Sequence, residues 1–177
     1  MVIAGFGGQG IIFAGKLLAY AGLIEEREVV FYPSYGAEMR GGTANCTVIL
    51  SDSLIPSPII SHPSSAIIMS YPALEKFLPR IKTKGQVVVN TSLIREKVKA
   101  DNLRLIEIPA NEIAEKIGTS KSANMVVLGA WAFFSRAVSL ESLIFSLKKL
   151  LPPHRLDLLG VNEKSLKEGW NFARFSN

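Results

Sequence analysis

The sequence predicts an α/β fold, a three-layer α/β/α sandwich around a mainly parallel sheet, in one domain over residues 1–177. Short apolar strands alternate with segments of helical periodicity along the chain. The first strand leads directly into a Rossmann-like glycine loop at the start of a helix. Hydrophobic residues make up 48% of the chain and charged residues 20%, a balance that favours a large buried core and excludes intrinsic disorder.

The N-terminal elements follow from local pattern. Residues 2–4 predict a short apolar strand, and a helix is expected from Gln9 to Leu23, because apolar residues recur there at helical spacing. Residues 28–32 predict a second strand that Pro33 should stop. Residues 34–42 hold three glycines in nine positions, which is typical of a loop or a short broken helix.

The rest of the chain repeats a strand–helix rhythm after a Pro/Ser-rich connection at residues 57–63. Further strands are expected at residues 43–50, 66–70, 86–90 and 103–108. Helices are expected at residues 73–80, 111–117, 122–136, 139–150 and 162–175. Fully apolar strands separated by helices predict a parallel sheet that is covered on both faces. We treat residues 153–177 as a helical C-terminal extension of the same domain.

Composition narrows the classes of function. The single cysteine, Cys46, cannot form an internal disulfide, hold an iron–sulfur cluster or complete a zinc site, so no metal site is expected on this chain. No apolar run is long enough for a membrane span, and no basic leader precedes the first strand, so we expect a cytoplasmic protein. The formal net charge of +5 lies on helical faces without interleaved aromatic residues, which argues against nucleic-acid binding.

The glycine loop, Gly5-Phe6-Gly7-Gly8-Gln9-Gly10, matches G-x-G-x-x-G between a strand and a helix. Its backbone can approach a phosphate closely, and the first N–H groups of the helix point at the anion. The alternative is that these glycines only pack the strand against the helix. A P-loop is excluded because Lys16 stands six residues after Gly10, and the end of the second strand offers no carboxylate for an NAD ribose.

The second loop, Tyr35 to Gly42, follows the second strand, where the carboxyl ends of parallel strands line a ligand crevice. Arg40 could bind a phosphate or carboxylate through two hydrogen bonds, Glu38 could hold a donor, and Tyr35 could stack. The alternative is a turn that is held by a local contact between Glu38 and Arg40.

Four stretches together resemble the gamma subunit of 2-oxoacid:ferredoxin oxidoreductases of the pyruvate, 2-ketoisovalerate and 2-oxoglutarate type. They are GFGGQGI (5–11), YGAEMRGG (35–42), VVVN (87–90) and ANMVVLG (123–129). The resemblance implies a subunit of an enzyme that oxidatively decarboxylates a 2-oxoacid and passes the acyl group to coenzyme A and the electrons to ferredoxin. It also implies alpha, beta and ferredoxin-like delta partner subunits, which carry thiamine diphosphate, magnesium and iron–sulfur clusters.

The resemblance also assigns site residues. It implies coenzyme A contacts along the glycine loop (Gly5, Gly7, Gly8, Gln9 and Gly10), with backbone N–H groups of the last four facing its phosphates. Tyr35, Glu38 and Arg40 would complete the site, Arg40 as a phosphate or inter-subunit contact. Asn124 would lie near the same crevice, although a helix-capping or core-bonded Asn124 is equally consistent with the sequence.

No catalytic base is assigned to this chain, because His62, His154 and Cys46 have no evident triad partner. Three alternatives remain open: a free-standing nucleotide-binding oxidoreductase, a pure interaction module, and a subunit of an indolepyruvate-type oxidoreductase. The C-terminal aromatic residues Trp170, Phe172 and Phe175 could dock on a partner or pack on their own domain. The sequence also leaves open whether the isolated chain forms a homodimer.

Overall fold

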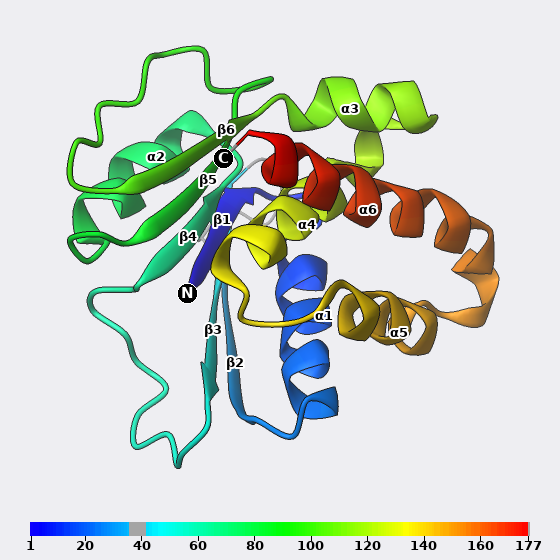
Figure 1. Cartoon of the computed structure of the whole chain (residues 1–177), viewed down its shortest axis with the longest axis horizontal. Coiled ribbons are helices and arrows are strands. Elements are labelled where there is room, and N and C mark those ends of the chain that lie inside the picture. Colours follow the sequence, from blue (N-terminus) through cyan, green and yellow to red (C-terminus); the bar gives the residue numbers. More distant parts are fainter. Residues whose placement is uncertain (36–41, 177) are drawn as a thin grey trace.

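The computed structural model describes residues 1–35 and 42–176 and confirms the α/β fold (Figure 1). The strands are β1 (Val2–Phe6), β2 (Glu28–Tyr35), β3 (Thr43–Ser51), β4 (Ser65–Ile68), β5 (Gln86–Asn90) and β6 (Arg104–Ile108). The α-helices are α1 (Ile11–Ile24), α2 (Tyr71–Phe77), α3 (Ala110–Ile117), α4 (Ala123–Ser135), α5 (Leu140–Leu150) and α6 (Leu159–Phe175). Three short 3-10 helices are η1 (Leu78–Arg80), η2 (Ser120–Ser122) and η3 (Pro153–Leu158).

The six strands form one sheet in the order β2-β3-β1-β4-β5-β6. Strands β1, β4, β5 and β6 pair in parallel, whereas β3 pairs antiparallel with both of its neighbours. The reversal of β3 has a simple cause. Only residues 36–42 connect β2 to β3, and a parallel connection needs a crossover of about a dozen residues or more.

The expected stop at Pro33 is wrong, because β2 continues to Tyr35 and Pro33 pairs with Cys46. Strand β2 lies at the edge of the sheet, where a proline without an N–H group breaks no ladder on the open side. The extended hairpin brings the ends of β1 and β2 to the same edge, since Phe6 pairs with Thr43 and Tyr35 pairs with Ala44. Both sequence motifs therefore start from one edge of the sheet.

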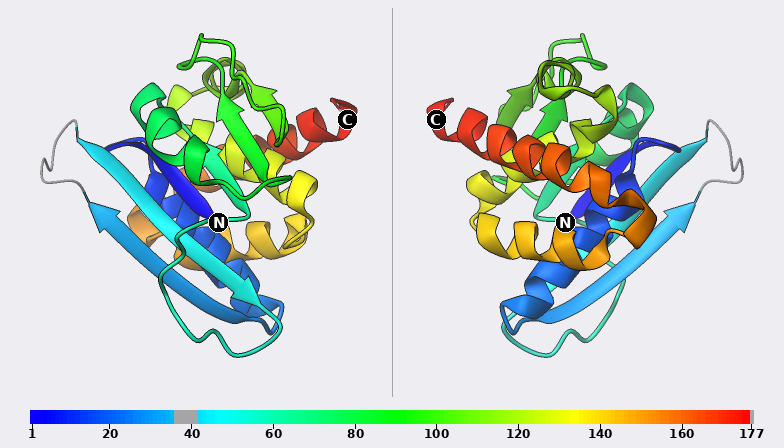
Figure 2. Two further views of the ribbon diagram at one scale, coloured as in Figure 1. Left: turned by 90° about the vertical axis from the view of Figure 1, so that its left-hand side faces the viewer. Right: turned by 90° about the vertical axis from the view of Figure 1, so that its right-hand side faces the viewer.

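Alternate strand residues face two separate cores. Ile3, Ile67 and Val88 belong to the larger core, which lies under α1, α4, α5 and α6. Val2, Ile68 and Val89 belong to the smaller core, which is closed by α2 and by the loop after β5. The sandwich is therefore asymmetric, with most helices on one face of the sheet (Figures 1 and 2).

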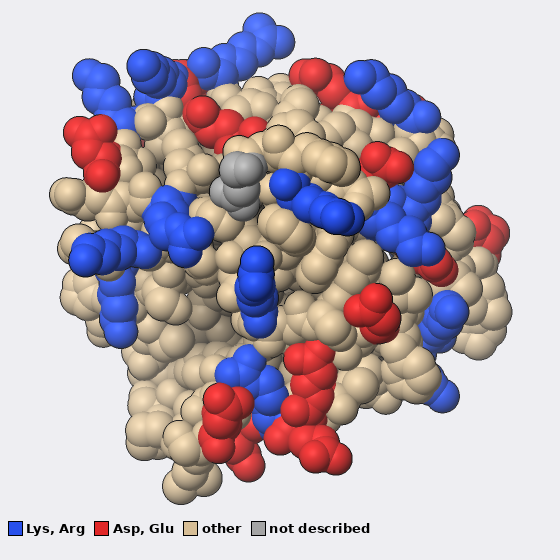
Figure 3. All heavy atoms as spheres, viewed as in Figure 1, with Lys and Arg blue, Asp and Glu red and all other residues tan. Residues whose placement is uncertain are grey.

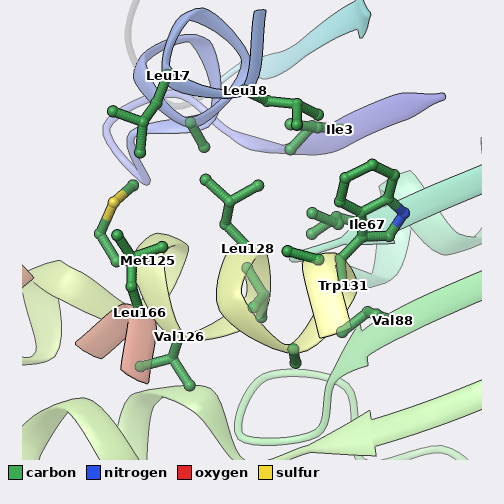
Figure 4. Packing of buried hydrophobic residues seen from close by; sticks show 14 of the residues in the cluster. Ile3, Leu17, Leu18, Ile67, Val88, Met125, Val126, Leu128, Trp131 and Leu166 are labelled. Carbon is green, nitrogen blue, oxygen red and sulfur yellow. The ribbon is translucent and has the colours of Figure 1, made fainter. Parts of the chain in front are cut away.

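Helix α4 lies in the centre of the larger core. Leu128 of α4 points toward Leu17 and Leu18 of α1, and Trp131 lies beside Ile67 of β4 (Figure 4). Eleven of the thirteen residues of α4 are buried, so the helix is apolar on all sides. The helix that the sequence predicts at residues 122–136 is thus a core helix, and α6 covers its outer side.

Helices α4 and α6 approach each other closely at two glycines. A Cβ atom at Gly129 would collide with the carbonyl oxygen of Leu166, and one at Gly169 would collide with that of Val126. The Phe133 and Trp170 rings meet edge to face beside this contact, with 5.3 Å between ring centroids. Phe172 also packs on the larger core, whereas Phe175 is 82% exposed. Two of the three C-terminal aromatic residues therefore pack on their own domain.

The outer face of β2 and β3 has no helix over it in the described part of the chain (Figure 2, left). No residue of these two strands belongs to the smaller core, and Tyr32 on this face is 55% exposed. The connection from β3 to β4 also exposes Leu54, at 83%, and Ile59, at 76%. No helix in the described ranges has the length and apolar character needed to cross a membrane.

Cys46 lies in the middle of β3 and is completely buried. Its Sγ atom packs under Gly15 of α1 and donates a weak hydrogen bond to the carbonyl oxygen of Ile11, at 3.6 Å. Burial raises the pKa of the Cys46 thiol to about 12. The side chain therefore serves as a small apolar group of the core.

Replacing Gly129 with alanine should lower the free energy of unfolding by about 2–3 kcal/mol, because the added methyl group meets backbone that cannot move aside. Chemical denaturation of the purified chain measures the change. Gly160→Ala is the matched control, because this glycine lies in α6 with open space around its Cβ position, and alanine there should be neutral or slightly stabilising. Equal unfolding midpoints for both variants would contradict close packing of α4 against α6.

At pH 8 a thiol reagent should modify Cys46 far more slowly in the native chain than in denaturant, by a factor on the order of 10³ or more. The reason is that the buried thiol becomes accessible only when the chain unfolds. A raised pKa keeps the group protonated at this pH, so raising the pH to 9 should not make it reactive. Timed alkylation followed by mass spectrometry measures both rates. Rapid labelling of the native chain would show that β3 opens locally.

Candidate functional site

The glycine loop joins β1 to α1 at the carboxyl edge of the sheet. Gly8 and Gly10 have positive φ angles of 91° and 71°, a conformation that side chains rarely adopt. Gly10 is the N-cap of α1, the first turn of that helix holds no acidic residue, and no side chain caps it. Its first amides therefore remain available to an anion.

Backbone hydrogen bonds close the loop. Gly7 N–H donates to the carbonyl of Gly42 at 2.9 Å, and Gln9 N–H donates to the carbonyl of Phe6 at 3.3 Å. These two amides thus support the loop, whereas the amides of Gly8 and Gly10 have no partner among the described residues. Our expectation of backbone contacts to phosphate therefore narrows to Gly8, Gly10 and the first turn of α1.

The side chain of Gln9 turns back into the fold. Its Oε1 atom accepts a hydrogen bond from Phe6 N–H at 2.6 Å, and its Nε2 atom donates to the carbonyl of Met69 at 3.2 Å. Gln9 thereby ties the end of β1 to the end of β4. Gly5 is buried within β1, and a Cβ atom there would collide with the side chains of Met69 and Ile11. In the structure this glycine therefore allows close packing of β1.

Asn124 connects the loop to a second helix. Its side chain is almost completely buried, and Nδ2 donates to the carbonyl of Gly10 at 3.1 Å while Oδ1 accepts from Met125 N–H at 3.0 Å. The amide group of Asn124 fills the space where Gly10 would carry a Cβ. The N-termini of α1 and α4 consequently lie side by side.

A cleft of about 570 Å³ opens at these two helix ends. Its polar and charged lining comes from the glycine loop, from η2 and α4, and from the chain around η3. The residues that line it are Gly8, Gly10, Phe13, Thr119, Lys121, Ser122, Asn124, Leu150, Leu151, Pro152, His154, Arg155, Leu158, Val161 and Asn162. Lys121 and Arg155 bring positive charge, and no carboxylate is among these lining residues.

Sequence reasoning missed Lys121 and Arg155 as site residues and set His154 aside. Lys121 stands just before the 123–129 stretch that carries the resemblance, so its position gave a usable signal. Arg155 and His154 lie on η3 and come to the glycine loop only because α5 and α6 fold back over α1 and α4. The local sequence does not predict that η3 comes close to the glycine loop.

The apolar part of the cleft comes from Phe13, Leu151 and Leu158, with Pro152 and Val161 beside them. Positive groups at one part of a cleft and apolar side chains along the rest suit a ligand with an anionic end and a less polar body. The cleft can therefore bind and orient such a molecule. Among the described residues, no three His, Cys, Asp or Glu side chains gather as a metal site would require.

The second predicted loop is described only at its ends. Glu38 and Arg40 lie outside the described residues. The backbone of Tyr35 ends β2 opposite Ala44, and Gly42 accepts the hydrogen bond from Gly7. The two motifs therefore share one edge of the sheet.

Comparison with known proteins identifies relatives along nearly the whole chain. The family model described as pyruvate ferredoxin/flavodoxin oxidoreductase matches residues 1–172. The 2-oxoglutarate synthase subunit KorC of Methanothermobacter marburgensis is 34% identical over 93% of this chain and 89% of its own length. The ketoisovalerate oxidoreductase subunit VorA of the same organism is 34% identical over 97% of this chain, which spans only 36% of VorA.

Two solved structures share the fold. The gamma subunit of a keto/oxoacid ferredoxin oxidoreductase from Geobacter sulfurreducens PCA has a TM-score of 0.84 at 26% identity, over 98% of this chain and 97% of that one. The 2-oxoglutarate:ferredoxin oxidoreductase from Magnetococcus marinus, solved with 2-oxoglutarate, coenzyme A and succinyl-CoA, has a TM-score of 0.88 at 24% identity. The similarity covers 98% of this chain and 30% of that one. With the family model matched over residues 1–172, the chain belongs to the pyruvate ferredoxin/flavodoxin oxidoreductase family.

Proposed function

We propose that this chain is the gamma subunit of a 2-oxoacid:ferredoxin oxidoreductase and that its cleft holds coenzyme A during oxidative decarboxylation of a 2-oxoacid. The products are acyl-CoA, CO2 and reduced ferredoxin. The observation that carries the proposal is the cleft at the N-termini of α1 and α4. Lys121 and Arg155 make it positive, and none of the described residues that line it is a carboxylate. Family membership over residues 1–172 agrees with it.

Coenzyme A matches both parts of the cleft. Its phosphates suit the free amides of Gly8 and Gly10 and the side chains of Lys121 and Arg155. Its long pantetheine arm suits the apolar wall of Leu151 and Leu158. The similar structure from Magnetococcus marinus contains coenzyme A, which supports this choice of ligand.

The protein's own contribution is to bind and orient. Gln9 and Asn124 hold the glycine loop so that its amides face the cleft, and the apolar wall excludes water from the arm. Thiamine diphosphate with magnesium, together with iron–sulfur clusters, would supply the decarboxylation and electron transfer on partner subunits. We also place Tyr35, Glu38 and Arg40 of the second loop near coenzyme A or the neighbouring subunit.

Two uncovered regions support assembly with alpha, beta and ferredoxin-like delta subunits. The outer face of β2 and β3 and the connection after β3 are open to solvent, and residues 53–64 contain no Asp, Glu, Lys or Arg. Exposed Leu54 and Ile59 on this connection are the kind of apolar surface that a subunit interface covers. In VorA the homologous segment is 36% of a longer chain, which agrees with a lasting contact between this domain and other protein. The complex would work in the cytoplasm of an anaerobic cell.

The nature of the 2-oxoacid would be set by the other subunits. The indolepyruvate oxidoreductase subunit IorB of Methanothermobacter thermautotrophicus is 27% identical over 97% of this chain, less than the KorC and VorA relatives. A free-standing nucleotide-binding oxidoreductase is less well supported. Glu28 lies at the far end of β2, opposite Ser51, and cannot hold a ribose at the glycine loop.

Replacing Lys121 or Arg155 with alanine should raise the KM of the assembled complex for coenzyme A about 10-fold each, because each change removes a charged hydrogen bond to phosphate. The KM for the 2-oxoacid should stay unchanged. Steady-state assays of the complex purified through a tag on this chain measure both constants.

Lys148→Ala is the matched control, because Lys148 is exposed on α5 and does not line the cleft. Its KM for coenzyme A should equal that of the unmodified complex. Unchanged coenzyme A kinetics in both cleft variants would remove this cleft from the site.

Ile59→Asp should leave the unfolding of the isolated chain within about 0.5 kcal/mol, because the side chain is 76% exposed. It should nevertheless reduce recovery of partner subunits in an anaerobic pull-down from the native cell, because a buried carboxylate would oppose docking. Leu23→Asp on α1 is the control, since Leu23 is also a large exposed apolar residue, at 56%, and lies outside this surface. Full recovery with both variants would contradict the assembly surface.

A further inference from the structure

The net charge of the chain is concentrated in one segment. Residues 75–104 hold eight basic and three acidic side chains, which equals the whole formal net charge of +5, and the remaining residues hold twelve of each sign. The preceding 34 residues, 41–74, contain Asp52 as their single charged side chain. Charge is thus segregated along the chain.

Folding brings most of these basic residues onto the side of the molecule that covers the smaller core. We call the following group the basic surface: Lys76, Arg80, Lys82, Lys84, Arg95, Lys97 and Lys99. Figure 3 shows basic side chains along its left and upper left margins, over the turn before β5 and the loop after it. The turn and the end of that loop are joined by a hydrogen bond from Lys84 N–H to the carbonyl of Asn102.

One of these charges has a contact within the fold, because the Lys76 ammonium group lies over the Phe77 ring, 5.3 Å from its centroid. The charged groups of the other six make no ion pair or ring contact among the described residues. All seven side chains are exposed, and none of them belongs to either of the two ion pairs found among the described residues. Their segments are held instead by inward residues of the smaller core, such as Phe77, Ile94 and Val98. Glu75, Glu96 and Asp101 are exposed on the same segments, so basic side chains exceed acidic ones by four. This excess of like charge is repulsive, so stability does not explain it.

The kind of charge indicates the kind of partner. Five of the seven residues are lysines, and lysine is depleted from the buried part of protein–protein interfaces, which argues against a tightly packed contact here. The surface is also unlike a nucleic-acid site, because Phe77, the aromatic ring among these residues, is buried. Lysine-rich surfaces are typical of brief encounters in which long-range attraction steers an acidic protein.

We propose that the basic surface steers an acidic electron-carrier protein of the ferredoxin class onto the complex. This inference rests on the proposed function, because a 2-oxoacid:ferredoxin oxidoreductase must meet its electron acceptor repeatedly and release it. Electron transfer itself stays with the clusters of the partner subunits. The basic surface raises the rate at which the carrier arrives.

The test uses the assembled complex with Lys97→Glu and Lys99→Glu combined, two exposed positions on the loop after β5. At low ionic strength, kcat/KM for an acidic ferredoxin from the same cell should fall about 10-fold. The difference should disappear at high salt, because salt screens long-range attraction. Turnover with methyl viologen, a small cationic dye, should not change. Lys16→Glu on α1 is the matched control and should leave the ferredoxin kinetics intact.

The outcomes separate the inference from the proposed function. Absence of 2-oxoacid-dependent dye reduction in the unmodified complex would overturn the proposed function. Normal dye reduction with unchanged ferredoxin kinetics in the double variant would overturn the inference alone. Loss of a partner subunit from the double variant would overturn it as well, because the surface would then be a permanent contact. The inference would also be overturned if the unmodified complex bound RNA and not ferredoxin, and the double variant lost that RNA binding.

Discussion

The burial of α4 between the sheet and α6 is the constraint on which the other features depend. Gly129 and Gly169 let the two helices approach closely, and Leu128 and Trp131 fill the space toward α1 and the sheet. Because α4 is fixed on both sides, its first residues are held at the end of the glycine loop. The Asn124 side chain then reaches the Gly10 carbonyl. A packing contact in the core therefore sets the geometry of the site.

The same arrangement explains the electrostatics of the cleft. Two long helices begin at one place, and no side chain caps the first turn of α1. The 3-10 helix η3 adds Arg155 and His154 from the connection between α5 and α6. The amides contribute fixed partial positive charge, and the side chains of Lys121 and Arg155 contribute full charges. Among the described residues no carboxylate lines the cleft, so these positive groups attract an anionic ligand. Binding there needs little rearrangement, because the loop is already closed by Gln9 and Gly42.

Charge is distributed so that different surfaces suit different partners. The uncharged connection at residues 53–64 exposes isoleucine and leucine, which favours lasting contact with protein. The basic surface over the smaller core favours brief contact with an acidic protein. Both lie away from the larger core, so substitutions on either surface can be tested without disturbing the fold.

The sequence by itself determined the succession of strands and helices along the chain, the position of the glycine loop and the family resemblance. These features depend on local periodicity and short motifs. Only the tertiary structure decided the direction of β3, the course of β2 past Pro33, and the partners of Gln9 and Asn124. Gln9 bonds to Met69, 60 residues away, and Asn124 bonds to Gly10, 114 residues away. Lys121 and Arg155 likewise meet the glycine loop only through folding. Contacts between distant segments depend on how whole helices and strands pack together, and local sequence patterns do not predict that packing.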